Sequence, residues 1–238
     1  MRARTVAAGA LAMLVLATGC GASGGSGGSS ASTPAGNGVA STSAQEILAA
    51  ATTAAKAQSS VHIAGVDTTG TDKTELDLSL AKGVGATGTI TMGGNKIQLI
   101  TTTDSVYMKA DKAFWTQFGS AAAAAVIGDR WVKASSTNAS FKDLASLGDF
   151  ASSLDQYLKP TSTITKGEEK TVDGVPAIGL TDGEGTLWVA TSGDPLPVRI
   201  EPKATGNGGM AFTAWGAPVT ITPPAAKDTL DLSAISGS

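Results

Sequence analysis

Two residue types on which many catalytic sites depend are nearly absent from this 238-residue chain, which has one cysteine and one histidine. A single cysteine cannot form an intramolecular disulfide, and no Cys/His cluster has the spacing of a zinc site. The acids Asp67, Asp72, Glu75 and Asp77 lack the spacing of a calcium loop. Alternation places the lone His62 on the water-facing side of a strand, and no triad pattern accompanies it. The sequence therefore predicts no metal, no cofactor and no enzyme activity.

The chain also lacks an excess of basic residues. It has 17 Lys and Arg against 20 Asp and Glu, a net charge of −3. Residues 1–19 contain two arginines and no acids, so the rest of the chain has 15 basic and 20 acidic residues and a net charge near −5. Neutralising the phosphates of a nucleic acid requires a basic surface. Nucleic acid is therefore not expected as a partner.

The apolar run at the N-terminus, residues 6–16, is too short to span a membrane. It follows Arg2 and Arg4, which is the pattern of a signal peptide over residues 1–19. Residues 16–20 resemble a bacterial lipobox, with Ala17 where leucine is usual. The thiolate of Cys20 is then the nucleophile that accepts a diacylglyceryl group. With a further acyl chain such as palmitate, this gives a stable anchor on the extracytoplasmic face of the cell membrane.

Large apolar and charged side chains are scarce in residues 21–42, which consist mainly of Gly, Ser, Ala and Thr. Such a segment buries too little surface to fold, and about 20 residues of it have a root-mean-square reach of roughly 25 Å. We expect residues 20–42 to form the lipidated cysteine and a tether. Residues 43–224 are expected to form one domain and residues 225–238 a C-terminal tail.

The domain begins with a capping box at Ser43 and Glu46, which predicts a helix to about Gln58. Alternation of apolar and polar residues then predicts about five strands up to residue 109. Two helical segments follow, expected to stop at Gly128 and Pro160, and about five more strands come after them. Asp173-Gly174 is a strong hairpin signal, and residues 218–221 are a candidate edge strand.

These elements predict an α+β fold with one large, strongly curved antiparallel sheet. We expect a half-barrel of about 10–11 strands with helices covering its concave side. Gly83, Gly85 and Gly88 match a dinucleotide fingerprint. Strand-forming residues follow the glycines in place of the helix that such a site needs, so we interpret the motif as a turn.

Five strand and turn fragments of the domain are distinctive, namely residues 60–63, 106–108, 130–132, 174–177 and 193–200. They resemble those of actinobacterial lipoproteins of the LppX/LprG type, which are similar in fold to the LolA/LolB lipoprotein carriers, and the resemblance extends over residues 43–224. It implies a half-barrel with helices over an apolar cavity, and binding or transfer of a lipid or lipoglycan. It implies no catalytic residues.

The apolar residues of the strands and helices are candidates for an acyl-chain pocket or for a filled core. They are Leu76, Leu78, Leu80, Ile90, Met92, Ile97, Leu99, Val106, Met108, Phe114, Trp115, Phe118, Phe150 and Leu154. An open pocket predicts a lipid carrier. A filled interior predicts a non-enzymatic envelope accessory protein that contacts an unknown protein partner or a cell-wall polymer. The sequence leaves both interpretations open.

Overall fold

The computed structural model describes residues 36–67, 73–203 and 208–235, which fall within one compact unit. The expected signal peptide, Cys20 and most of the expected tether lie outside the described residues.

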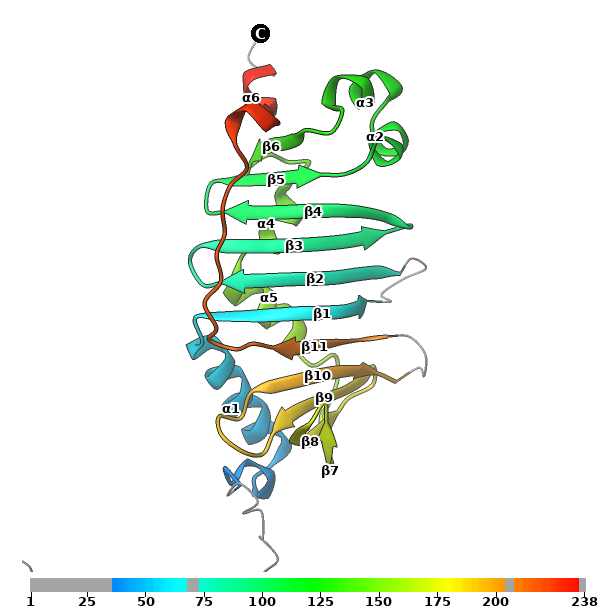
Figure 1. Ribbon diagram of the computed structural model, residues 1–238. Coiled ribbons are helices and arrows are strands. Elements are labelled where there is room, and N and C mark those ends of the chain that lie inside the picture. The colour runs from blue at the N-terminus through cyan, green and yellow to red at the C-terminus, as the bar shows by residue number, and fades with distance from the viewer. Residues whose placement is uncertain (1–35, 68–72, 204–207, 236–238) are drawn as a thin grey trace, which may run out of the picture. The chain divides into compact units, whose positions relative to one another are not determined.

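Twelve strands form one sheet in the order β12-β6-β5-β4-β3-β2-β1-β11-β10-β9-β8-β7 (Figure 1). Neighbouring strands are antiparallel, except for the parallel pair β12 and β6. The strands are β1 (Ser60–Asp67), β2 (Thr74–Ala81), β3 (Gly85–Met92), β4 (Asn95–Thr102), β5 (Ser105–Lys109), β6 (Trp131–Ser135), β7 (Thr165–Val172), β8 (Val175–Thr181), β9 (Gly185–Ala190), β10 (Pro197–Pro202), β11 (Gly209–Thr213) and β12 (Thr229–Asp231). The sheet is open, because β7 and β12 are its two edges.

The helices are α1 (Ala44–Ala57), α2 (Lys112–Phe118), α3 (Ala121–Ile127), α4 (Lys142–Ser146), α5 (Phe150–Leu158) and α6 (Leu232–Ile235). The capping box at the start of α1 is present, since Ser43 and Glu46 each accept a hydrogen bond from the other's backbone. The hairpin at Asp173-Gly174 is also confirmed, with positive φ at both residues. The α+β fold expected from the sequence is therefore confirmed.

Strand register places the apolar residues in rows on one face, which we call the inner face. Leu78 on β2 lies opposite Ile63 on β1 and Gly88 on β3. The row continues through Leu99 on β4 and Met108 on β5. Opposite residues in an antiparallel pair project from the same face, so each row is a continuous apolar stripe across the sheet.

Helices cover this inner face in two main clusters. The central cluster consists of inner-face residues of β1–β5 and β11 with Ala55 of α1 and three residues of α5, Phe150, Leu154 and Leu158. The α2–α3 cluster joins both short helices to Ile97, Met108 and Val132 of the sheet. Burying each large apolar side chain contributes about 1.5 to 3 kcal/mol, so these two clusters hold helices and sheet together.

The chain beyond β11 differs from expectation. Residues 218–221 form no strand, because this proline-containing segment runs across the ends of the strands and not beside an edge (Figure 1). Residues 229–231, within the expected C-terminal tail, instead form β12 at the edge of the sheet. The prediction of an edge strand at residues 218–221 is therefore wrong.

Replacement of Gly88 by alanine should lower the free energy of unfolding by about 2 to 4 kcal/mol. Gly88 has a φ of 152°, and a Cβ there would lie 2.0 Å from the carbonyl oxygen of Asp77. Urea denaturation measures the effect, with Thr89→Ala on the outer face of the same strand as the control. Equal stability of the two variants would contradict the close strand approach.

The contact of β12 with β6 should weaken in acid. Lys133 Nζ lies 2.8 Å from Asp231 Oδ2, and hydrogen bonds from Lys133 and Ser233 lower the pKa of Asp231 to about 2. Because the pKa is lower than in the unfolded chain, this stabilisation is present above about pH 4 and is lost as the pH falls through about 2.

The pair is one-third exposed, so we expect Asp231→Asn to lower the free energy of unfolding by less than about 1 kcal/mol near pH 6 and by nothing near pH 2. Urea denaturation at both pH values tests this, with the exposed Asp228→Asn as the control. A loss that does not depend on pH would rule out the ion pair as its cause.

Candidate ligand-binding cleft

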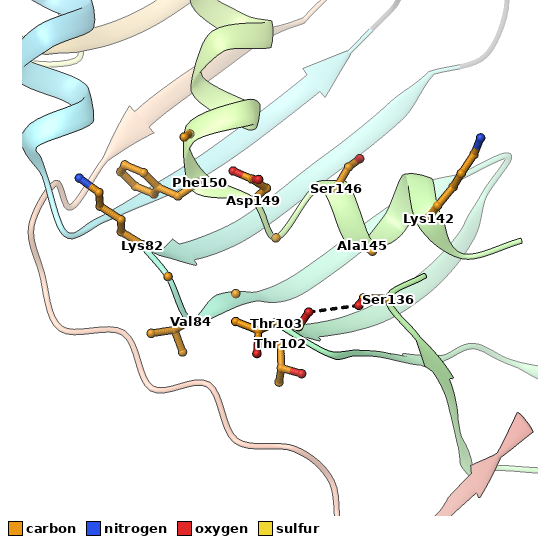
Figure 2. Close-up of a pocket in the computed structure, with 14 residues that line it drawn as sticks. Lys82, Val84, Thr102, Thr103, Ser136, Lys142, Ala145, Ser146, Asp149 and Phe150 are labelled. Carbon is orange, nitrogen blue, oxygen red and sulfur yellow. Dashed lines mark hydrogen bonds between the residues drawn. The ribbon is translucent and has the colours of Figure 1, made fainter. Parts of the chain in front are cut away.

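A cleft of about 500 Å³ opens between the strand turns at one edge of the inner face and the helices α4 and α5 (Figure 2). One wall is the β2–β3 turn, and the β4–β5 turn and Ser136 continue it. The other wall runs from Lys142 in α4 to Ala151 in α5. The volume is within the range of pockets that hold small organic ligands.

The β2–β3 wall owes its shape to glycine. Gly83 and Gly85 have φ values of 72° and 142°, which other residues rarely adopt. The tight turn leaves Val84 at the lip of the cleft, where the residue is 49% exposed. Lys82 comes just before the turn and donates a hydrogen bond of 2.8 Å to the carbonyl of Lys56 at the end of α1. The motif that mimics a dinucleotide fingerprint therefore forms the rim of the cleft.

The helical wall is held against the sheet by a close approach. Asp149 caps α5 by accepting a hydrogen bond of 3.0 Å from the backbone amide of Ser152. Just before it, Gly148 lies so near Thr101 that an added Cβ would come within 1.9 Å of the Thr101 hydroxyl oxygen. That buried hydroxyl accepts a hydrogen bond of 2.8 Å from the amide of Ala86. Gly148 thus fixes the distance between the helices and the inner face.

The cleft combines an apolar interior with charges at its mouth. Phe150 is 2% exposed and belongs both to the cleft lining and to the central cluster. Lys82, Lys142 and Asp149 are exposed at the opening, and Figure 2 shows the two lysine side chains directed away from the interior. Such an arrangement suits an amphiphile whose apolar part enters and whose polar part stays in water.

The structure divides the predicted pocket residues between the two clusters. The central cluster contains Leu76, Leu78, Leu80, Ile90, Leu99, Val106, Phe150 and Leu154. The α2–α3 cluster contains Ile97, Met108, Phe114 and Trp115, and Met92 packs against both. Phe118 lies on the same side of α2 as Phe114 and its ring contacts that of Phe114, but it is 61% exposed because α2 ends there. Phe150 is the member of the set that lines the described cleft.

Strand register also creates a contact that the sequence did not indicate. His62 Nδ1 lies 3.1 Å from Ser79 Oγ, and His62 Nε2 lies 3.7 Å from Asp77 Oδ1. The second distance is too long for a hydrogen bond, so the carboxylate does not orient the imidazole as a catalytic triad requires. The three side chains belong to the outer face, away from the cleft lining. Only the pairing of β1 with β2 could have revealed this cluster.

Within residues 36–67, 73–203 and 208–235, no group of three or more His, Cys, Asp or Glu side chains is arranged to hold a metal ion. None of the helices in the same ranges is long and apolar enough to span a membrane.

The chain is similar in fold to a solved structure. LprF from Mycobacterium bovis has a TM-score of 0.50 and 19% sequence identity, with 77% of this chain and 97% of LprF covered. The chain has the fold of LprF. The Mycobacterium tuberculosis lipoprotein LppX has a TM-score of 0.46 and 16% identity, with 75% of this chain and 99% of LppX covered. No protein-family model and no curated protein matches the sequence.

The likeness to LprF confirms the α+β fold with an open, mostly antiparallel sheet that the resemblance to LppX/LprG-type lipoproteins implied. It covers nearly the whole of LprF, so no large part of that fold is missing from this chain.

Replacing Gly148 by alanine should destabilise the protein by about 1 to 3 kcal/mol, because the new methyl group collides with Thr101. Thr101→Ala removes the colliding hydroxyl but leaves the amide of Ala86 without its partner, which is also destabilising. In a double-mutant cycle measured by urea denaturation, Gly148→Ala should destabilise the protein less in the Thr101→Ala background. Purely additive effects would show that the two residues do not meet.

Proposed function

We propose that this protein is a membrane-anchored envelope lipoprotein that binds a lipid or lipid-linked glycan between its sheet and its helices. The observation that carries the proposal is the cleft beside the central cluster, with Phe150 common to both. An acyl chain that enters there follows the apolar stripes of the inner face, while the polar head stays near Lys82 and Lys142. The LprF fold supports the proposal.

The role proposed for the protein is binding and not catalysis. The His62 cluster lies on the outer face with an Asp77 contact of 3.7 Å, and the cleft lining contains hydroxyls, two lysines and one aspartate without a histidine.

A second candidate function has its own support. Leu78, Leu99 and Leu154 are at most 3% exposed and belong to the same central cluster, as in a filled core. A protein with such an interior would act through its surface, as an accessory protein that contacts a protein or a cell-wall polymer. With such an interior, a lipid enters only when α4 and α5 move away from the sheet. The free energy that this movement costs therefore decides between the two functions.

Mass spectrometry of bound material tests the proposal directly. The exported chain with Cys20→Ser, which cannot be acylated, is purified from an actinobacterial host and weighed under native and denaturing conditions. A stoichiometric excess of native mass that extracts into organic solvent as lipid is expected. A protein without bound lipid, which also takes up no added phospholipid or lipoglycan, would favour the accessory function.

Filling the cleft should block lipid uptake. Ala151 lines the cleft on α5 and is exposed, so tryptophan is tolerated there and narrows the mouth. We expect Ala151→Trp to lower lipid affinity about tenfold, equivalent to about 1.4 kcal/mol. Titration with a fluorescent phospholipid measures the affinity, and Ala49→Trp, at an exposed alanine of α1, is the matched control. Equal binding by both variants would place the entrance elsewhere.

A further inference from the structure

The chain between β11 and β12, residues 214–228, forms a strap on the outer face of the sheet. It leaves β11, passes the ends of β1–β5 on the side opposite α4 and α5, and reaches β12 (Figure 1). From residue 217 to residue 222, half-buried and exposed residues alternate. Val219 and Ile221 are on the half-buried side, which therefore faces the sheet.

The strap covers a row of small residues at these strand ends. Strand register aligns Ser60, Ala81, Gly85 and Thr102, one residue from each of β1–β4. The neighbouring residue Leu80 belongs to the inner face, so alternation places this row on the outer face. Ser60 is 2% and Ala81 8% exposed, although α1 and α5 pack against the opposite face. The strap is therefore what shields the row from water.

Hydrogen bonds hold the strap firmly at its β11 end. The amide of Gly216 donates to the carbonyl of Ser60 over 3.0 Å, and the Ser60 hydroxyl donates to the carbonyl of Ala217. The indole of Trp215 donates to the carbonyl of Pro197 over 3.0 Å and packs against the central cluster. This end of the strap is thus fixed to both the sheet and the core.

The rest of the strap is held more weakly. Within residues 36–67, 73–203 and 208–235, the segment 218–224 forms no hydrogen bond, and three of its seven residues are proline, which favours an extended backbone. At the far end, β12 has three residues and lies at the sheet edge beside β6, with the Lys133–Asp231 ion pair one-third exposed. A short edge element with few contacts opens at a low free-energy cost. The β12 end is therefore the releasable one.

The covered row and the cleft share residues. Gly85 and Thr102 belong to the row and also line the cleft, so the strap lies on the outer side of the strand ends whose turns form the cleft wall. Gly83 and Gly85 give the β2–β3 turn a wide range of backbone conformations. A contact on the outer side of these strand ends limits the movement of the wall.

We propose that the strap regulates the cleft. While β12 is paired with β6, the strap holds the β2–β3 and β4–β5 turns in place. Detachment of β12 loosens both turns, widens the mouth of the cleft and speeds exchange of the ligand. The inference rests on the proposed function only where it concerns the ligand, because the restraint on the turns does not depend on what the cleft binds.

Hydrogen exchange measured by NMR tests the restraint without ligand, in the full chain with Cys20→Ser. The probes are three hydrogen-bonded amides of the cleft wall, those of Lys82, Val84 and Ser105. Asp231→Lys places a second positive charge beside Lys133 and should detach β12. Asp228→Lys makes the same charge change at an exposed residue of the strap and is the control.

The three amides should exchange about tenfold faster in Asp231→Lys than in Asp228→Lys, because release of β12 lowers the cost of local opening. The amide of Asp182, which is hydrogen bonded in the distant β8–β9 turn, should be unchanged. Unchanged exchange at the cleft wall, or an equal increase at Asp182, would overturn the proposal.

A second pair of variants tests the strap without altering β12. Val219→Ser with Ile221→Ser removes the apolar side chains that face the sheet, and Thr220→Ser with Thr222→Ser changes the exposed side as the control. The first variant should also speed exchange at the cleft wall, and the second should not. No increase in the first variant would show that the strap does not transmit the release of β12.

Release of a fluorescent phosphatidylcholine to phosphatidylcholine vesicles tests the effect on the ligand. Asp231→Lys and the Val219→Ser with Ile221→Ser variant should each release it about tenfold faster than their controls, in line with the faster local opening. Equal release rates would overturn regulation of the cleft. If the unsubstituted protein binds no lipid at all, the proposed function is refuted, and hydrogen exchange still decides whether the strap restrains the turns.

Discussion

Burial of the inner sheet face against α1, α4 and α5 is the constraint on which the rest of the domain depends. Strands β1–β5 present their leucines, isoleucines and valines on that face, and an open sheet of this size cannot leave them in water. Separate helices joined by loops cover this face, and no single helix covers all of it. The cleft lies where α4 and α5 meet the ends of the strands.

Small residues set how closely these layers approach. Gly88 interrupts an apolar row of the inner face and lets β3 come near β2, and Gly148 lets the start of α5 rest on Thr101. Larger side chains at these two positions would push the layers apart.

The outer surface of the domain is not uniform. The β7 edge is covered with charged and polar side chains and contains a register shift between Lys166 and Glu169, features that discourage pairing with another sheet. At the other end, the α2–α3 hairpin has no charged residue from position 113 to position 128 and exposes Phe118 and Val126.

Sequence by itself determined the alternating strands, the capping box at Ser43, the turn at Asp173-Gly174 and the apolar set that forms the core, because each depends on residues near one another in the chain. It also excluded a nucleotide site at Gly83, since strand-forming residues follow. Only the tertiary structure decided that β12 joins the edge at β6, that Phe118 is exposed at the end of α2, that His62 contacts Ser79, and that Phe150 belongs both to the cleft lining and to the core. These features depend on register between distant strands and on where a helix ends relative to the sheet, and a local pattern carries no information about either.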